Sequence, residues 1–294
     1  MTRLDELVAY PVKSLDGVSV ERGELGPTGA LRGDRSYAFV EAGVDPDVAS
    51  VGSGGGYVNG KSEPAIHGLR ASYDLAGPAD ATPTAVTLER PARGNAPADR
   101  QTFALPAEGD ALAGWVGEYL GYEVDLVRDP DGGFPDDRAA PGPTVISAGT
   151  LRELASWFDS IADPTEARRR FRPNVVVAAC PAFWEDRLFA DHGFGVRVAV
   201  GDATLCGINP CQRCVVPSRH PDTGATIDGF RERFVRKRRE TLPEWTETDR
   251  FDHEFRVMVN TVVPERSWGT TIGVGDAVEI EATVEVDGEP PEAT

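Results

Sequence analysis

Lysine is nearly absent from this chain of 294 residues. Of the 30 Lys and Arg residues, only Lys13, Lys61 and Lys237 are lysines, while acidic residues number 48 and the formal net charge is −18. Nucleic acids and anionic membranes attract basic proteins, so we expect neither as a partner. A lysine-poor acidic surface is also typical of proteins from a salt-rich cytoplasm, which is our hypothesis for the setting.

Long apolar runs and a secretion signal are missing as well. The opening residues, MTRLDELVAYPV, contain no apolar core of a signal peptide, and no segment approaches the length of a membrane span. The chain has only four cysteines, which in an unsecreted protein indicates reduced thiols rather than a disulfide framework. We therefore expect a cytoplasmic globular protein, long enough for one large or two ordinary domains.

Several common catalytic motifs are absent. The sequence has no phosphate-binding G-x-x-x-x-G-K-[ST] loop, no G-x-S-x-G elbow and no H-E-x-x-H pair. The triplet Asp222-Thr223-Gly224 has no second copy, which excludes an aspartic protease. The histidines share no metal-ligand spacing and are His67, His192, His220 and His253.

Short alternating apolar runs between turn residues predict a mixed α+β fold that is rich in strands. Over residues 1–105 these runs recur about every ten positions, which predicts a barrel or a sandwich. Helical spacing of apolar residues predicts helices over 108–121 and 228–240. The polar, Pro/Gly-rich segment 128–143 predicts a domain boundary. The glycine-rich loop 43–64 is either a surface loop or a lid over a ligand.

Three of the four cysteines lie between Cys206 and Gly224, in the stretch CGINPCQRCVVPSRHPDTG. Because proline blocks helix and ladder hydrogen bonds, we expect a shaped loop between strands here. Thiols on a rigid loop beside Arg213 suggest a soft-metal ligand or an activated thiolate.

The spacing of these cysteines leaves several kinds of site open. Cys206, Cys211 and Cys214 begin an iron–sulfur pattern that lacks its fourth cysteine downstream. His220, or Cys180 upstream, could complete a structural metal site. Cys206 alone also fits a buried small hydrophobe on a strand.

Separate polar residues could form an anion site. Lys13 with the hydroxyl of Ser14 suits a phosphate, and Arg35 suits either a ligand or a salt bridge with Asp34. Arg172 and Asn174 flank a proline at the start of a buried strand, which is either a ligand-facing position or a structural turn.

Ser147 stands where a short strand meets a helix, where it either binds an anion or caps the helix. Thr150 and Glu153 fit a capping box for that helix.

Four motifs in order resemble one family, the MOSC proteins with an N-terminal MOSC β-barrel domain, which include the mitochondrial amidoxime-reducing component. The motifs are Tyr10-Pro11-Val12-Lys13-Ser14, Gly33-Asp34-Arg35, Phe171-Arg172-Pro173-Asn174, and Cys211-x-Arg213-Cys214 with Pro221-Asp222-Thr223-Gly224. The resemblance covers about residues 3–282. It implies a β-barrel-like domain at 1–125, a MOSC β-barrel domain with peripheral helices at 126–284, and a disordered tail at 285–294.

The resemblance also implies a molybdenum-cofactor oxidoreductase that reduces N-hydroxylated small molecules. It makes Cys214 the molybdenum ligand and catalytic centre, and Cys180 a family cysteine that is not the ligand. The implied cofactor-binding residues are Lys13, Ser14, Arg35, Ser147, Arg172, Asn174 and Arg213.

Two departures from the family pattern bear on function. Ser218-Arg219-His220-Pro221 replaces the usual T-x-D-P, which would place His220 as a base near the site. The chain carries no C-terminal iron–sulfur domain, so we expect electrons from a separate flavin, haem or iron–sulfur protein. Besides a structural metal protein, a carrier that holds a persulfide or the molybdenum cofactor on Cys214 is the alternative to an enzyme.

Overall fold

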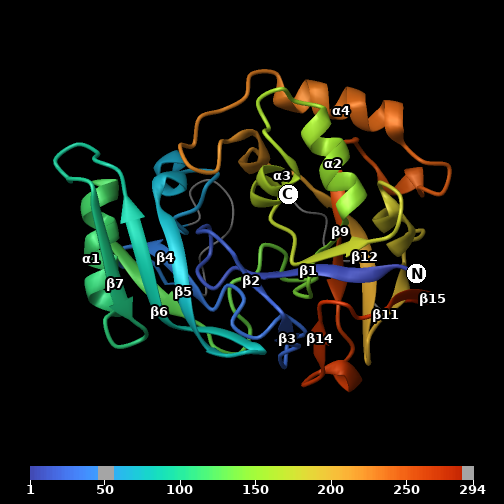
Figure 1. Ribbon diagram of the computed structural model, residues 1–294, viewed down its shortest axis with the longest axis horizontal. Coiled ribbons are helices and arrows are strands. Elements are labelled where there is room, and N and C mark those ends of the chain that lie inside the picture. Colours follow the sequence, from blue (N-terminus) through green and yellow to red (C-terminus); the bar gives the residue numbers. More distant parts are fainter. Residues whose placement is uncertain (46–55, 287–294) are drawn as a thin grey trace.

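The computed structural model describes residues 1–45 and 56–286. It is β-rich, as predicted, and consists of two bodies side by side (Figure 1). One body contains α1 and β4 to β8, and the other contains the largest sheet and the helices α2 to α4. Part of the predicted lid, residues 46–55, and most of the predicted tail, residues 287–294, lie outside the described residues.

The largest sheet has eight strands, and all neighbours are antiparallel except β9 and β10. In spatial order the strands are β15 (Val278–Glu285), β11 (Phe194–Val200), β12 (Ala203–Gln212), β13 (Arg256–Val262), β9 (Val145–Ser147), β10 (Val175–Ala178), β1 (Arg3–Ala9) and β2 (Val18–Val20). The sheet curls so that its two ends approach each other. The Leu4 amide donates to the Asp276 carbonyl (2.9 Å), and the Val278 amide donates to the Thr2 carbonyl (3.0 Å). These bonds tie β1 to the start of β15 without a continuous ladder.

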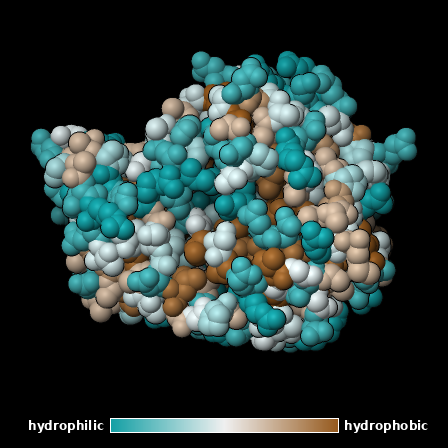
Figure 2. Space-filling model, in the orientation of Figure 1, coloured by the Kyte–Doolittle hydropathy of each residue, from teal (hydrophilic) through white to brown (hydrophobic). Residues whose placement is uncertain are grey.

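Three helices cover part of this sheet, with hydrophilic side chains over their outer surface (Figure 2). They are α2 (Ala148–Ser156), α3 (Pro164–Phe171) and α4 (Phe230–Thr241). Their inner faces bury an aromatic cluster in which Phe158 stacks on Phe230 (4.4 Å between ring centroids) and Phe234 meets Phe255 edge to face (5.0 Å). This packing confirms the predicted helix over 228–240.

The other body packs α1 (Gly109–Leu120) on a three-stranded meander and a strand pair. The meander consists of β5 (Arg70–Gly77), β6 (Asp80–Arg90) and β7 (Asp99–Ala104), and the pair of β4 (Tyr37–Glu41) and β8 (Val124–Arg128). Leu112, Trp115 and Val116 of α1 are buried, as their spacing predicts. Gly121 ends the helix at φ 88°, a conformation that glycine adopts without strain.

The chain passes between the two bodies more than once. The first strand, β1, pairs with β10 of the second half of the sequence, and β3 (Arg22–Glu24) pairs with β14 (Thr271–Gly273). The segment 128–143, predicted as a boundary, begins at the last residue of β8 and leads to β9. The division at residue 125 stays a prediction.

Two local predictions were wrong. Thr150, predicted to begin a capping box with Glu153, does not cap the helix. Helix α2 begins at Ala148, and its cap is Ser147, whose Oγ accepts from the Thr150 amide (3.0 Å). Residues Cys206 to Gln212 belong to β12 instead of a loop, because irregularities in the β12–β13 register accommodate Pro210. In the described parts of the chain, no helix is both long and apolar enough to cross a membrane.

Candidate functional site

A cleft of about 1490 Å³ brings together segments that are far apart in the sequence. Its walls come from both halves of the chain and include residues 14–16, 34–35, 59–61, 66–67, 69, 135–144, 169–172, 174, 208–214 and 249–252. It contains most of the predicted site residues: Ser14, Arg35, Arg172, Asn174, Arg213 and Cys214 all line it. Lys13 and Ser147 do not belong to its lining.

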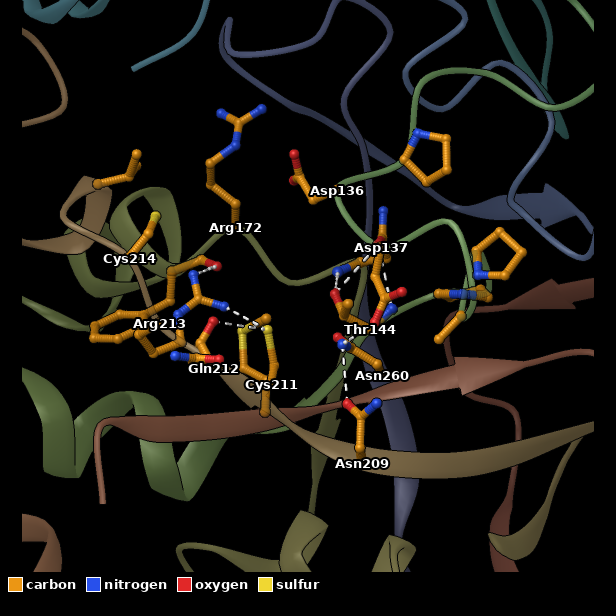
Figure 3. Close-up of a pocket in the computed structure, with 18 of the residues that line it drawn as sticks. Asp136, Asp137, Thr144, Arg172, Asn209, Cys211, Gln212, Arg213, Cys214 and Asn260 are labelled. Carbon is orange, nitrogen blue, oxygen red and sulfur yellow. Dashed lines mark hydrogen bonds between the residues drawn. The ribbon is translucent and has the colours of Figure 1, made fainter. Parts of the chain in front are cut away.

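Cys211 and Gln212 are the last residues of β12, and Arg213 and Cys214 follow them on one wall of the cleft (Figure 3). The Arg213 amide donates to the Phe255 carbonyl (2.9 Å), and its guanidinium donates to the Cys211 sulfur and to the Phe171 carbonyl (3.0 Å each). Burial raises the pKa of the Cys211 thiol, and the charge of Arg213 offsets this only in part. Cys211 is therefore held as a thiol, and Cys214 is the second sulfur of the cleft.

Arg172 follows Phe171, whose carbonyl accepts from Arg213, and its guanidinium extends away from the two sulfurs (Figure 3). It caps α3 in a left-handed conformation, with φ 57° and ψ 50°. One guanidinium nitrogen donates to the Leu15 carbonyl (2.6 Å), and the guanidinium stacks over the ring of Tyr10 (4.1 Å to the centroid). The other terminal nitrogen is buried without a hydrogen-bond partner, and so is Nε of Arg213. Buried donors normally have partners, so these two nitrogens indicate a place for an anionic ligand.

Lys13 and Arg35 meet at a carboxylate that the sequence analysis missed, that of Asp136. The Lys13 ammonium lies 2.6 Å from one oxygen of Asp136 and 2.8 Å from the Phe134 carbonyl, and Arg35 lies 3.4 Å from the other oxygen. Although burial opposes ionisation, the charges of Lys13 and Arg35 hold the pKa of Asp136 below its usual range. Arg35 also pairs with Asp34, which was one of its two predicted roles.

Asn174 lines the cleft, but its amide serves the scaffold. It is buried, and it donates to the Val8 carbonyl (3.0 Å) and to Oδ1 of Asp34 (3.2 Å), which also accepts from the Tyr10 amide (2.7 Å). Asn174 and Asp34 therefore fix the backbone of Tyr10 and the orientation of Arg35. Ser147 is fully buried as the cap of α2, which favours the structural alternative for that residue.

The structure also separates residues that were candidates for one metal site. Cys206 is buried on β12, as expected for a small hydrophobe, and His220 accepts from the Asp222 amide instead of lining the cleft. Among residues 1–45 and 56–286, no three His, Cys, Asp or Glu side chains lie close enough to hold a metal ion. A metal at this site would therefore need further ligands besides those of residues 1–45 and 56–286.

Four site residues escaped the sequence analysis: Tyr10, His67, Asp136 and Arg219. Tyr10 stood within a quoted motif, and its ring lies beside both Arg35 (5.2 Å) and Arg172 (4.1 Å). Asp136 lies in the segment interpreted as a polar linker. Nothing in the local sequence distinguishes His67 or Arg219 from surface residues, and both line the cleft only through tertiary folding.

Chemically, the cleft combines a thiol with guanidinium groups whose charge is not matched. Within the described residues, no carboxylate lies within 4.0 Å of Arg172 or Arg213. Such a site suits a ligand that carries both negative charge and a soft metal.

Comparison with known proteins relates the sequence to one protein family. Residues 1–123 match the MOSC N-terminal beta barrel domain, and residues 144–279 match the MOSC domain. The sequence is 24% identical over 251 residues to mitochondrial amidoxime reducing component 2 of Bos taurus, covering 75% of this chain and 67% of that protein. It is 24% identical over 249 residues to component 1 of Homo sapiens, covering 74% and 66%.

A third relative has a different name. Molybdenum cofactor sulfurase of Oryza sativa subsp. japonica is 24% identical over 265 residues, which cover 76% of this chain and 29% of the sulfurase. The chain thus spans about two thirds of the amidoxime-reducing relatives and under a third of the sulfurase. The chain belongs to the MOSC proteins that carry an N-terminal MOSC β-barrel domain.

Proposed function

We propose that this protein binds a molybdenum–pterin cofactor and reduces N-hydroxylated small molecules with electrons from a separate redox protein. The family and its amidoxime-reducing relatives support a function related to this cofactor. The observation that carries the proposal is the pairing of the Cys214 thiol with buried, unpartnered guanidinium nitrogens in one cleft.

The residues of the cleft fit such a cofactor. Its phosphate needs cationic donors, which the free nitrogens of Arg172 and Arg213 would supply. Its metal needs a soft ligand, which is the role we assign to Cys214. Lys13 and Arg35 would add positive charge behind Arg172, with Asp136 as their counter-ion, and Ser14 lines the same wall. Ser147 has no contact with the cleft, and we do not include it in the site.

The chain's own contribution is to bind, position and shield. When bound, the cofactor supplies the two-electron chemistry that removes oxygen from an N–OH group. Arg213 is oriented by the carbonyl of Phe171, and Arg172 by the carbonyl of Leu15 and the ring of Tyr10. These contacts fix both cations before any ligand arrives, which lowers the entropic cost of binding.

Metal and pterin analysis of the purified protein tests the proposal. We expect about one molybdenum and one pterin phosphate per chain, and we expect Cys214→Ala to lose most of the molybdenum. Cys180→Ala is the control, because Cys180 is half-buried after β10 and does not line the cleft. A wild-type protein without pterin, or a Cys214→Ala protein with full metal content, would contradict the assignment.

A carrier of sulfur or of the cofactor is the second candidate, favoured by the similarity to molybdenum cofactor sulfurase. Cys214 would then hold a persulfide for transfer. Intact-protein mass spectrometry distinguishes the two: a reductant-labile mass gain of one sulfur atom, lost in Cys214→Ala and kept in Cys211→Ala, would favour the carrier.

A further inference from the structure

Arg219 is a cleft residue that the proposed function does not use. It lies five positions after Cys214, and it follows the short helical turn η3 (Val216–Ser218). Its terminal nitrogens reach only two backbone carbonyls, at 3.5 Å (Gly224) and 3.3 Å (Lys61), and its Nε is buried without a partner. Within the described residues, no carboxylate lies within 4.0 Å of it. In a protein with a net charge of −18, an unmatched guanidinium inside a cleft points to a ligand.

The backbone that carries Arg219 is fixed in place. Arg170 of α3 donates to the Arg219 carbonyl (2.6 Å) and to the Pro217 carbonyl (3.2 Å), and its own charge is matched by Glu166 (2.6 Å). The Arg219 amide also donates to the Val216 carbonyl (2.9 Å). The direction of the Arg219 side chain is therefore set by the scaffold rather than by a ligand.

His67 adds a second unmatched polar group on the same wall. It belongs to η1 (Pro64–Gly68), lines the cleft, and has a buried Nε2 without a hydrogen-bond partner. Burial, and then the charges of Arg172, Arg219 and Arg170, lower the pKa of His67 to about 4. Of these three arginines Arg170 is paired with Glu166, whereas among the described residues no carboxylate lies within 4.0 Å of Arg172 or Arg219, so this part of the cleft is a region of positive potential.

This region differs from the group formed by Lys13 and Arg35. There the charges are already balanced by Asp34 and Asp136 within 3.4 Å or less. At Arg219 and His67 the described residues place no carboxylate within 4.0 Å. The charge of Arg172 acts on both regions, because it lowers the pKa of Lys13 as well as that of His67.

We propose that Arg219 and His67, bordered by Arg172, form a subsite for an anionic group of the substrate, so that the preferred substrate is an N-hydroxylated compound that also carries a carboxylate. The inference rests on the proposed function. The Arg219 guanidinium would take the carboxylate in its two-nitrogen fork, with the imidazole of His67 as an additional donor. The N–OH group would then lie toward Cys214.

Paired probes test the subsite. The purified protein is assayed with benzamidoxime and with 4-carboxybenzamidoxime, which differ by one carboxylate. For Arg219→Gln we expect kcat/KM for the carboxylated probe to fall roughly 10- to 100-fold, the range for loss of a charge-assisted hydrogen bond. For benzamidoxime we expect a change of less than about threefold, and Arg219→Lys should recover part of the lost rate.

Arg138→Gln is the matched control, because it removes the same charge from an exposed position on the cleft wall. It should change both probes by less than about threefold. An equal loss on both probes in Arg219→Gln, or a loss of molybdenum or pterin, would overturn the proposal, since Arg219 would then serve the scaffold or the cofactor.

Calorimetric binding keeps this test separate from the test of the reductase. If neither probe is reduced, the proposed reaction fails, but binding of 4-carboxybenzamidoxime still decides the subsite. We expect the wild type to bind the carboxylated probe more tightly than benzamidoxime, and Arg219→Gln to lose that preference. A wild type without the preference would refute the subsite.

Discussion

The helical layer and the cleft both bury arginines, but they treat the charge differently. Arg170 of α3, which also lines the cleft, is paired with Glu166 (2.6 Å), and Arg238 under the helices is paired with the buried Asp186. In the cleft, Arg172, Arg213 and Arg219 have no carboxylate within 4.0 Å among the described residues. Each also has a buried nitrogen without a partner, but so does Arg238, so the counter-ion and not the free nitrogen separates the two groups. Arg170 and Arg172 are only two residues apart on α3 and its cap.

The difference separates charges that stabilise the fold from charges that are kept for a ligand. A buried ion pair is costly to break, because the remaining partner becomes an uncompensated charge. An arginine without a carboxylate already carries that cost in the ligand-free protein, so its removal should be tolerated. Burial alone does not separate the two classes, whereas the presence of a counter-ion does.

The same substitution at positions 170 and 172 tests most directly whether a paired and an unpaired arginine differ in their contribution to stability. Arg170→Met leaves Glu166 without its partner and frees the carbonyls of Pro217 and Arg219, so we expect a loss of about 3 kcal/mol in the free energy of unfolding. Arg172→Met removes an unmatched charge and one hydrogen bond, so we expect a change within about 1 kcal/mol. Urea unfolding of the cofactor-free proteins measures both.

The same two variants should differ in the opposite sense in their ligands. Arg172→Met should lose pterin phosphate on purification, whereas the folded fraction of Arg170→Met should retain it. Equal destabilisation by the two substitutions would show that Arg172 is a structural residue like Arg170.

The sequence predicted the helices better than the strand pairing, and the reason is physical. Periodicity is a local property, so α1 and α4 could be predicted from apolar spacing alone. The pairing of β1 with β10 joins residues 3–9 to residues 175–178, and no local pattern encodes it. The assignment of Pro210 to a loop failed because register irregularities in β12 let a strand contain it.

The candidate site divides in the same way. Cys214, Arg172 and Arg213 could be predicted because they stand in recognisable motifs. Asp136 could not, because its role depends on a segment that folds back onto Lys13 and Arg35. Local sequence also favoured His220 over Arg219, but which of two neighbouring side chains enters a cleft depends on the backbone direction at that point.

Glu185 sharpens the comparison, because it is a fully buried carboxyl of the helical layer with one unpartnered oxygen. Burial, and then the charge of Asp186, raise its pKa to about 7. Between pH 4.5 and 7 the unfolded chain releases this proton while the native protein keeps it, so stability from this group falls as pH rises. Glu185→Gln keeps the shape and the acceptor for the Ser147 amide (3.1 Å) without the charge.

We therefore expect Glu185→Gln to gain about 2 kcal/mol of stability relative to wild type between pH 5 and pH 8. Urea unfolding across this range measures the difference. Glu232→Gln, at an exposed position of α4, controls for general charge effects. A difference that does not vary with pH would show that Glu185 is ionised throughout.

His67 is a buried titratable residue of the cleft, as Glu185 is of the helical layer, and we expect its substitution to change stability least. Its pKa of about 4 lies below the usual value, chiefly because of burial and then because of Arg172 and Arg219. As pH falls from about 6.5 to 4, the unfolded chain takes up a proton that the native protein refuses, so stability from this group is lost on the acid side. His67→Gln should remove roughly 1 kcal/mol of that acid-side loss.

The ligand links this prediction to the proposed anion subsite. A carboxylate bound between His67 and Arg219 would balance the surrounding cations and raise the pKa of the imidazole. With saturating 4-carboxybenzamidoxime, the wild type should therefore lose less stability between pH 6.5 and 4 than it does without the probe. In His67→Gln, the probe should change this acid-side loss of stability less than it does in the wild type. Thermal unfolding with and without the probe measures both. Identical acid-side curves for wild type and His67→Gln would mean that the imidazole is protonated in the native cleft, and that this wall is not as positive as its unmatched arginines imply.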